Sequence, residues 1–480
     1  MNEGYYINPY RIPCQRTSGY IHWSVSEYNN NNAWYYNGNN GTLNNNNKYN
    51  SNQVRPSLAR YYDDDHLLDY PIPYNEFIDY YRKCRQKKRR KASPLIFEHN
   101  QVEELITLCH ELNMGDYLQR TSIAFIITRP KVREVIAADF RDRVAQTILV
   151  QKLLPYMERY LHPDSYACRV KRGGLAAARQ FRRYVYEVSE GYTVDCWLFS
   201  LDIQAFFPSI DTAYWTDKLL EFVDERYEEA DISVVKYLIK QIYLYEPQTN
   251  CVKMSPDWMW GLVDPAKSML YGKAPHIGLA IGNVTAQFLA LFVTTKVLYR
   301  LSEMGVKFVC YTDDIKGVVR DKDKFLRSLP EIRAMFEDEC HLHLHPKKFD
   351  IQHYSHGIRV GAFKVRFDRL LPNDRVAHNF KFKVGQAIKK ANEDEKYIYK
   401  HKEDVMAFVN SYLGMLKHCN SYRLRSSQIE RLKNSPWSKV FVFSDDCLKI
   451  NIKSKFTEQT YYRLKTKECK RKIVSLLAAA

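Results

Sequence analysis

Three aspartates lie where apolar, strand-like runs end, and carboxylates in such places can bind cations. Asp202 follows the apolar run 197–201, and the adjacent Asp313 and Asp314 separate the runs 308–311 and 315–319. Short apolar runs bounded by polar residues are typical of buried strands. The second pattern therefore predicts a β-hairpin that presents Asp313 and Asp314 at its tip.

The chemistry open to these carboxylates depends on whether they meet in the fold. Like charges this close cannot both stay ionised at low cost unless a cation lies beside them. If Asp202 approaches the hairpin, the carboxylates can hold two Mg²⁺ ions about 3.5–4 Å apart, which would clamp the attacking and leaving oxygens of a phosphoryl displacement. Carboxylate oxygen is the ligand that hard divalent ions prefer, and Mn²⁺ is an alternative ion for the same site.

Acid clusters also occur as ordinary turn residues, and this sequence contains two that resemble the hairpin pair. One acid pair, at 445–446, follows the apolar run 440–443, and residues 63–65 are three consecutive aspartates. Position after an apolar run therefore does not by itself single out Asp313 and Asp314. The residues around each acid cluster must therefore decide which cluster is catalytic.

Short strands alternating with helices are expected around these acids, between about 120 and 365. Strands are predicted at 122–128, 197–201, 307–311 and 317–319. Helices are predicted at 95–112, 141–156 and 405–416. The chain is therefore expected to belong to the α+β class.

Composition favours a polyanionic partner. Lys plus Arg number 72 against 55 for Asp plus Glu, which gives a formal net charge of +17 over 480 residues. No run of eighteen apolar residues and no export signal is visible, so we expect a nucleic-acid partner, no membrane partner and a cytoplasmic location. The 11 cysteines are scattered singly, which predicts reduced thiols rather than disulfides or a zinc site.

The ends of the chain differ in composition from its centre. Asn occupies 13 of the 24 positions from 29 to 52, and such a segment buries little apolar surface, which predicts a mobile or loosely docked arm. Eight of the ten residues from 82 to 91 are basic and are candidates for phosphate contact, although a solvated helix face is an equal alternative. These eight are Arg82, Lys83, Arg85, Lys87, Lys88, Arg89, Arg90 and Lys91.

The order of several short motifs resembles that of the bacterial reverse transcriptases. Residues 311–314 fit the Tyr-x-Asp-Asp box of that family, and residues 199–211 look like its first palm aspartate box. Residues 278–287 are similar to the Gly-rich box that lies between them. Further boxes are matched in order at 129–135, 140–144, 165–174, 345–348, 357–363 and 411–418. The resemblance covers roughly residues 120 to 425. Residues 216–275 make a longer gap than the palm of that family needs, which implies an inserted helical piece.

The resemblance implies a right-hand polymerase fold of fingers, an antiparallel palm and a helical thumb, with an N-terminal extension. The implied domains are an arm at 1–60, a basic helical extension at 61–119, fingers and palm at 120–365, and thumb and tail at 366–480. The implied activity is RNA-directed DNA synthesis from deoxynucleoside triphosphates. A structured non-coding RNA is the expected template and partner. Whether the chain also forms a homo-oligomer is left open by the sequence.

The family's site residues can be carried over position by position. Asp202, Asp313 and Asp314 would be the catalytic metal ligands, with the carbonyl of Ile203 as a further ligand. Phe207 would lie under the incoming sugar and exclude a 2′-hydroxyl, so the product should be DNA.

Nucleotide-binding roles are also implied by the resemblance. Gly282 would let the backbone approach the nascent base pair, because glycine has no Cβ. Lys131, Arg133 and Arg169 would neutralise the triphosphate. Lys347 or Lys348 would protonate the departing pyrophosphate, and the sequence does not choose between them.

Two bacterial groups resemble the chain most closely: the defence-associated reverse transcriptases that act against phage, and the enzymes of diversity-generating retroelements. The Asn-rich arm, the basic run and the long basic tail favour the defence group. Ala280 and Ile281 depart from common residues of the middle box without removing a charge or a metal ligand.

Two alternatives of another class are a non-catalytic RNA-binding scaffold and a maturase-like splicing cofactor. A tyrosine as primer is a further hypothesis, and packing is the more ordinary role for the 36 tyrosines.

Overall fold

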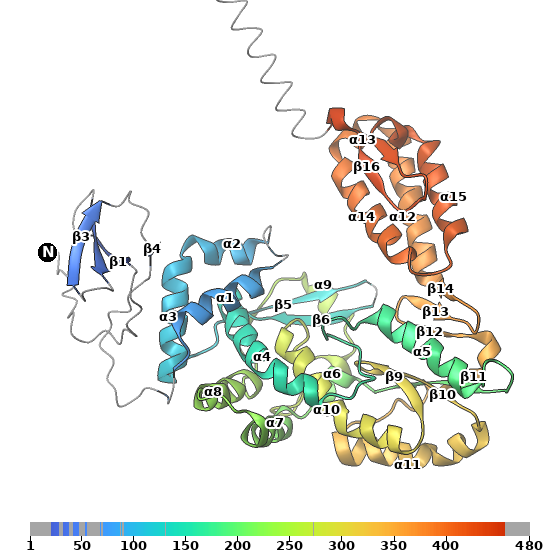
Figure 1. The fold of residues 1–480 in the computed structure, drawn as a ribbon, viewed down its shortest axis with the longest axis horizontal. Coiled ribbons are helices and arrows are strands. Elements are labelled where there is room, and N and C mark those ends of the chain that lie inside the picture. The colour runs from blue at the N-terminus through green and yellow to red at the C-terminus, as the bar shows by residue number, and fades with distance from the viewer. Residues whose placement is uncertain are drawn as a thin grey trace, which may run out of the picture. The chain divides into compact units, whose positions relative to one another are not determined.

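The computed structural model describes residues 21–27, 32–37, 42–47, 53–54, 68, 71–86, 88, 91–129, 131–271 and 273–456 (Figure 1). The chain divides into two compact units, and each is assembled from two separate stretches. The first unit comprises Met1–Leu161 and Ala205–Val293, and the second comprises His162–Gln204 and Thr294–Ala480. The four consecutive domains expected from the sequence, with boundaries near 60, 119 and 365, do not coincide with these two units. That domain division stays a prediction.

The Asn-rich segment contains a four-stranded sheet in the order β3-β2-β1-β4. Strands β1 (Ile21–Glu27), β2 (Asn32–Asn37) and β3 (Thr42–Asn47) pair antiparallel in succession. Strand β4 (Gln53–Val54) pairs parallel with β1. These ladders are more regular structure than the Asn-rich composition predicts.

Helices make up most of the first unit. Helices α1 (Tyr74–Arg85), α2 (Ala92–His99) and α3 (Gln101–Met114) pack against the long helix α4 (Phe140–Tyr160). The prediction of one helix over 95–112 was wrong at Asn100. Its φ of −120° and ψ of 34° lie outside the helical region, so α2 ends there and α3 begins.

The segment 216–275, expected to be helical, is mainly helical but also contains the strand β8 (Cys251–Lys253). Helices α7 (Thr212–Arg226) and α8 (Ile232–Tyr243) pack on each other, and α8 also packs on α4. The short helices α6 (Phe206–Ser209) and α9 (Asp257–Trp260) and the 3₁₀ turn η2 (Pro265–Lys267) complete the helical part of this insertion and its flank.

A three-stranded sheet in the order β6-β5-β8 completes the first unit. Strand β5 (Ser122–Ile127) pairs antiparallel with β6 (Arg133–Ala137) and parallel with β8 (Cys251–Lys253). The buried carboxylate of Glu134 accepts hydrogen bonds from the Ser268 hydroxyl (2.6 Å) and the Met269 N–H (2.8 Å). These bonds fix the loop after η2 onto the sheet.

An antiparallel sheet in the order β11-β7-β10-β9 forms the centre of the second unit. The strands are β7 (Trp197–Asp202), β9 (Lys307–Tyr311), β10 (Asp314–Val319) and β11 (Asp350–His353). One face, with Leu198 and Val318, packs on α5 (Gly174–Val188) and on a second small sheet. That sheet contains β12 (Ile358–Val360), β13 (Phe363–Val365) and β14 (Leu370–Pro372).

The opposite face of the central sheet packs on helix α11 (Lys322–Cys340). The rings of Phe199 and Phe325 stack with centroids 4.2 Å apart. A Cβ on Gly317, which pairs with Phe199 across the sheet, would lie 2.0 Å from the Phe199 ring. Glycine is therefore required at 317 because the ring occupies the space of a side chain.

The C-terminal part of the second unit is a helical bundle closed by a hairpin (Figure 1). Its helices are α12 (Asp374–Glu393), α13 (Lys396–Lys400), α14 (Lys402–Leu416) and α15 (Tyr422–Lys433), followed by η4 (Pro436–Lys439). The hairpin consists of β15 (Phe441–Phe443) and β16 (Ile450–Ile452). The two remaining turns are η3 (Tyr354–His356) and η5 (Ser454–Phe456). Trp437, fully buried, joins the bundle because its indole N–H donates to the Ala387 carbonyl (3.0 Å).

One helix of the described chain, α10 (Val284–Glu303), is long and apolar enough to cross a membrane, with a mean hydropathy of 1.2. Within the protein, 72% of its apolar window is buried. Burial of that extent is typical of a core helix.

Candidate active site

The hairpin that carries the acid pair is formed as predicted, and its loop is two residues long. Tyr311 and Asp314 are partners in the β9–β10 ladder, so Thr312 and Asp313 make the turn. Thr312 has φ of +64°, in the left-handed region. A β-branched residue is strained there, and such strain is common at functional sites.

The strand β7 brings Asp202 directly opposite Asp314. The two residues are Cα partners at the end of the β7–β10 ladder, and opposite residues of antiparallel strands have Cβ atoms about 4.5–5.5 Å apart on one face. Beyond this pair, the Ile203 N–H donates to the Asp313 carbonyl (3.2 Å). The end of β7 and the hairpin loop are thus held together by a backbone hydrogen bond as well as by the β7–β10 strand pairing.

A backbone segment on the far side of β9 supports the hairpin. The Cys310 N–H donates to the Asp164 carbonyl (2.8 Å), and the Tyr166 N–H donates to the Cys310 carbonyl (2.9 Å). Burial raises the pKa of the Cys310 thiol, and the nearby Asp314 and Asp313 carboxylates raise it further. Cys310 therefore packs beneath the acids as a neutral thiol.

Each of the two facing carboxylates is paired with a lysine. Lys348 Nζ lies 2.6 Å from Asp202 Oδ2, and Lys316 Nζ lies 2.6 Å from Asp314 Oδ1. The Asp202 and Asp314 side chains keep 25% and 40% of their surface exposed. Cations are thus already drawn to these oxygens, and solvent retains access to them.

A cavity of about 490 Å³ is lined by Ser200 and Lys316, which neighbour the facing pair on the same face of the sheet. Arg359 and Lys364 line it, and they are direct cross-strand partners on β12 and β13. Like charges placed opposite one another destabilise a sheet unless an anion lies between them. In the described part of the chain, neither residue has an acid within ion-pair distance. The lining also includes Arg375 and the acids Asp350 and Asp374, so the cavity carries charges of both signs.

The facing acids suit divalent ions by their chemistry. Asp202 and Asp314 offer hard oxygen ligands from one face of the sheet, as Mg²⁺ requires. Among the described residues, no group of three or more His, Cys, Asp or Glu side chains is gathered as a metal site. The structure therefore pairs two of the expected ligands. Asp313 lies next to them on the loop, and its role as a third ligand stays a prediction.

Two other expected site residues, Lys347 and Arg169, also belong to the second unit. The Lys347 side chain is exposed, whereas Lys348 reaches Asp202. The Arg169 guanidinium donates to the carbonyls of His162 (2.8 Å) and Ser165 (3.1 Å). Of the two lysines that the sequence left open, the structure places Lys348 at the acids. A triphosphate role for Arg169 stays a prediction.

Four expected nucleotide-binding residues belong to the first unit. Lys131 and Arg133 are exposed at the start of β6, and Phe207 is half-buried in α6. Gly282 has φ of +126°, and a Cβ there would lie 2.8 Å from the Val135 side chain. Glycine at 282 is thus explained by its close approach to β6. The nucleotide-binding roles of these four residues stay predictions.

Arg82, Lys83 and Arg85 of the basic run lie in the last turn of α1, where positive charge is favoured by the helix dipole. Arg82 pairs with Asp79 (3.1 Å), Arg85 pairs with Glu98 (2.6 Å), and the Lys83 ammonium donates to Gln151 (3.0 Å). Lys88 contacts Cys84, and Lys91 precedes α2. Lys87, Arg89 and Arg90 lie outside the described residues. Phosphate contact by this run stays a prediction.

The second acid pair is a turn, as the ordinary alternative predicts. Asp446 accepts hydrogen bonds from the Ser444 hydroxyl (2.6 Å) and the Leu448 N–H (3.0 Å) within the β15–β16 loop. These bonds lower its pKa. Residues 63–65 lie outside the described chain. Asp446 is thus capped within its own loop, whereas Asp202 and Asp314 face each other across two strands.

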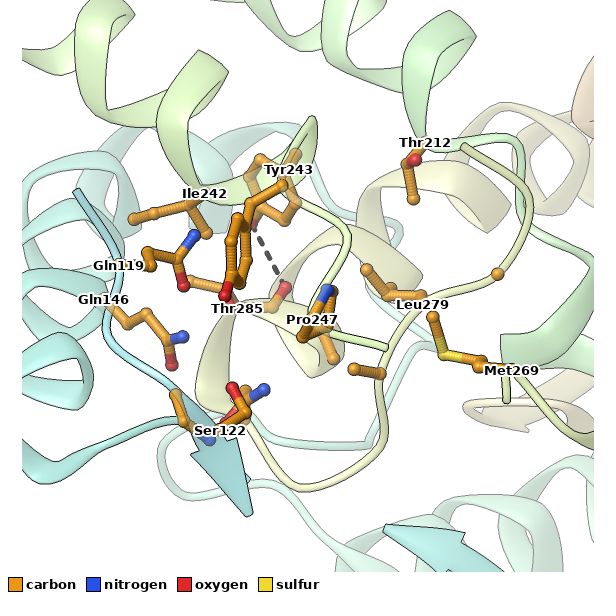
Figure 2. A pocket seen from close by; sticks show the side chains of 16 residues that line it. Gln119, Ser122, Gln146, Thr212, Ile242, Tyr243, Pro247, Met269, Leu279 and Thr285 are labelled. Atoms are coloured by element: carbon orange, nitrogen blue, oxygen red, sulfur yellow. Dashed lines mark hydrogen bonds between the residues drawn. The ribbon is translucent and has the colours of Figure 1, made fainter. Parts of the chain in front are cut away.

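A second cavity, in the first unit, has a volume of about 40 Å³ (Figure 2). Gln146 and Tyr243 line it, and the Tyr243 hydroxyl donates to the Thr285 carbonyl (3.1 Å). The buried Gln146 Oε1 has no protein partner among the described atoms. This space accommodates a few waters but no nucleotide.

Sequence reasoning missed Lys316 and Ser200. Lys316 follows Asp314 by two residues on one strand, so its side chain must lie on the same face. The strand period was a usable signal for Lys316. The partner Ser200 required the register between β7 and β10, which a single sequence does not show.

Comparisons with known proteins give only distant similarity. No family model matches the sequence, and no curated protein matches it significantly. A solved structure of apo telomerase from Candida tropicalis, truncated from its C-terminal domain, aligns over 53% of this chain with 9% identity and a TM-score of 0.37. Telomerases from Candida albicans and Candida tropicalis in complex with a fragment of telomeric RNA align over 65% and 66% of this chain. Their identities are 10% and 8%, and their TM-scores are 0.37 and 0.41.

The aligned region spans 55% of each telomerase chain.

Proposed function

We propose that the chain is an RNA-directed DNA polymerase that copies an associated non-coding RNA. The observation that carries this proposal is the cross-strand pairing of Asp202 with Asp314 beside the loop of Asp313. The motif order of the reverse transcriptases supports the same conclusion. The net charge of +17 supports a nucleic-acid substrate.

In the proposed reaction, a 3′-hydroxyl attacks the α-phosphate of a deoxynucleotide and pyrophosphate leaves. Asp202 and Asp314, together with Asp313, would hold the divalent ions, which when bound supply charge stabilisation for the phosphoryl displacement. Arg359 and Lys364 would bind phosphate in the adjacent cavity. Lys348, whose ammonium reaches the acids, would give a proton to the leaving pyrophosphate.

Primer extension by the purified chain tests the activity. We expect Asp202→Asn and Asp314→Asn each to lower the rate by at least about 1,000-fold, equivalent to about 4 kcal/mol, because each removes a charged ligand. Asp445→Asn is the matched control, since it changes an acid of the turn pair, and it should keep the full rate. Equal rates in all three variants would show that the facing acids do not catalyse.

The template and the biological role need a separate experiment. We propose a role in defence against phage, and diversification of a target sequence is the alternative. Sequencing of the RNA that co-purifies with the chain, and of the DNA made from it, should return one structured RNA and its copy. Phage challenge of cells that carry wild type or Asp202→Asn then tests defence. Equal plaque counts would exclude that role.

A further inference from the structure

Lys316 occupies a position from which it can act on the facing acids. It follows Asp314 by two residues on β10, and its Cα partner on β7 is Ser200. Asp202 follows Ser200 by two residues on β7, so all four side chains lie on one face in two adjacent rows. The cross-strand pair of Lys316 and Ser200 is thus the immediate neighbour of the pair of Asp314 and Asp202.

The ammonium of Lys316 is held on both sides. It lies 2.6 Å from Asp314 Oδ1, and it also donates a hydrogen bond to the Ser200 hydroxyl. Only 12% of the Lys316 side chain is exposed. The two partners and the burial together keep this charge beside Asp314.

Lys348 differs in all of these respects. Its side chain is 53% exposed, and its one described side-chain partner is Asp202. A long, exposed lysine exchanges readily between solvent and an ion pair. Lys348 can therefore leave when another cation arrives, whereas Lys316 is anchored by Ser200.

We propose that Lys316 is a positioning residue that orients the Asp314 carboxylate and weakens the binding of divalent ions there. The proposal rests on the proposed function. Oδ1 of Asp314 is engaged by the lysine, so Oδ2 is the oxygen left to face a metal ion. A fixed positive charge also repels a doubly charged ion at short range. The chain should thus need a higher divalent-ion concentration than the same acids would need without the lysine.

Direct binding of Mn²⁺ to the intact chain tests this inference. We expect Lys316→Met to bind Mn²⁺ about 10-fold more tightly by electron paramagnetic resonance, because it removes one charge next to the ligand. Lys316→Arg keeps the charge and should stay within about 2-fold of wild type. Ser200→Ala frees the ammonium without removing it and should give a smaller gain, about 2- to 3-fold.

Lys307→Met is the matched control. It removes one lysine from the same hairpin, but Lys307 pairs with Val318 at the far end of β9. Its Mn²⁺ affinity should equal that of wild type, and circular dichroism should show all four variants folded. The Mg²⁺ midpoint for primer extension should fall in Lys316→Met and not in Lys307→Met.

The outcomes separate this inference from the proposed function. If wild type binds no Mn²⁺ and Asp202→Asn makes no difference, the polymerase proposal fails. If wild type binds Mn²⁺ through Asp202 but Lys316→Met binds equally or more weakly, the polymerase proposal stands and the role of Lys316 is overturned. A gain in Lys307→Met as large as in Lys316→Met would also overturn it, since net charge alone would then explain the effect.

Discussion

At the scale of single residues, buried charge and close packing explain why particular side chains are present. The acid Asp142 in α4 is fully buried and accepts hydrogen bonds from the Tyr117 hydroxyl (2.9 Å) and the Arg120 N–H (2.8 Å). Burial nevertheless raises its pKa to about 6, although these bonds and Arg141 lower it. The folded first unit therefore binds a proton more readily than the unfolded chain does.

This raised pKa predicts a pH dependence of stability. Since the folded pKa exceeds the ordinary value of 3.8, the stabilisation from protonated Asp142 is complete below about pH 4 and is lost as the pH rises through about 6. Hydrogen exchange of α4 amides should show weaker protection at pH 7 than at pH 5. In Asp142→Asn, which cannot ionise, this difference should shrink. An unchanged difference would contradict the assignment to Asp142.

Gly317 gives a second prediction at this scale. Gly317→Ala should lower the free energy of unfolding by on the order of 3 kcal/mol, because the new Cβ would overlap the Phe199 ring. Gly414→Ala is the control, since nothing lies within 4 Å of that position in helix α14. It should be neutral or stabilise by up to about 1 kcal/mol. Thermal denaturation of both variants measures the contrast.

At the scale of elements, the parts of the fold that sequence reasoning predicted are those with a strong local pattern. The strand β7 and the hairpin of β9 and β10 were predicted because apolar runs and acids mark their ends. The break at Asn100 was missed because apolar spacing continues across it. The pairing of Asp202 with Asp314 followed from family resemblance, and periodicity alone did not give the register.

Helix α11, which covers one face of the central sheet, depends on its first turn. The Asp321 side chain accepts a hydrogen bond from the Lys324 N–H (2.8 Å). Asp321→Ala should lower the free energy of unfolding by about 1 kcal/mol, because the N–H loses its acceptor. Asp321→Asn keeps an acceptor and should stay within about 0.5 kcal/mol of wild type. Equal losses in both variants would argue that charge rather than capping matters.

At the scale of the whole molecule, the net charge of +17 predicts how RNA binding responds to salt. The logarithm of the binding constant should fall linearly with the logarithm of the salt concentration, because bound counterions are released. Arg359→Met should reduce the slope by about one, since it removes one phosphate contact in the cavity beside the acids. Fluorescence anisotropy with a labelled RNA at several salt concentrations measures both. A slope equal to that of wild type would place Arg359 outside the RNA interface.

The interleaving of the two units affects how the chain folds during synthesis. Strand β7 leaves the ribosome well before its partners β10 and β11, because a stretch that belongs to the other unit is translated in between. Until then, Leu198, Phe199 and Leu201 have no sheet to join, and unpaired apolar strands are prone to aggregate. The nascent chain should therefore be a client of ribosome-associated chaperones from the appearance of Trp197 until its partner in β10, Val319, has emerged.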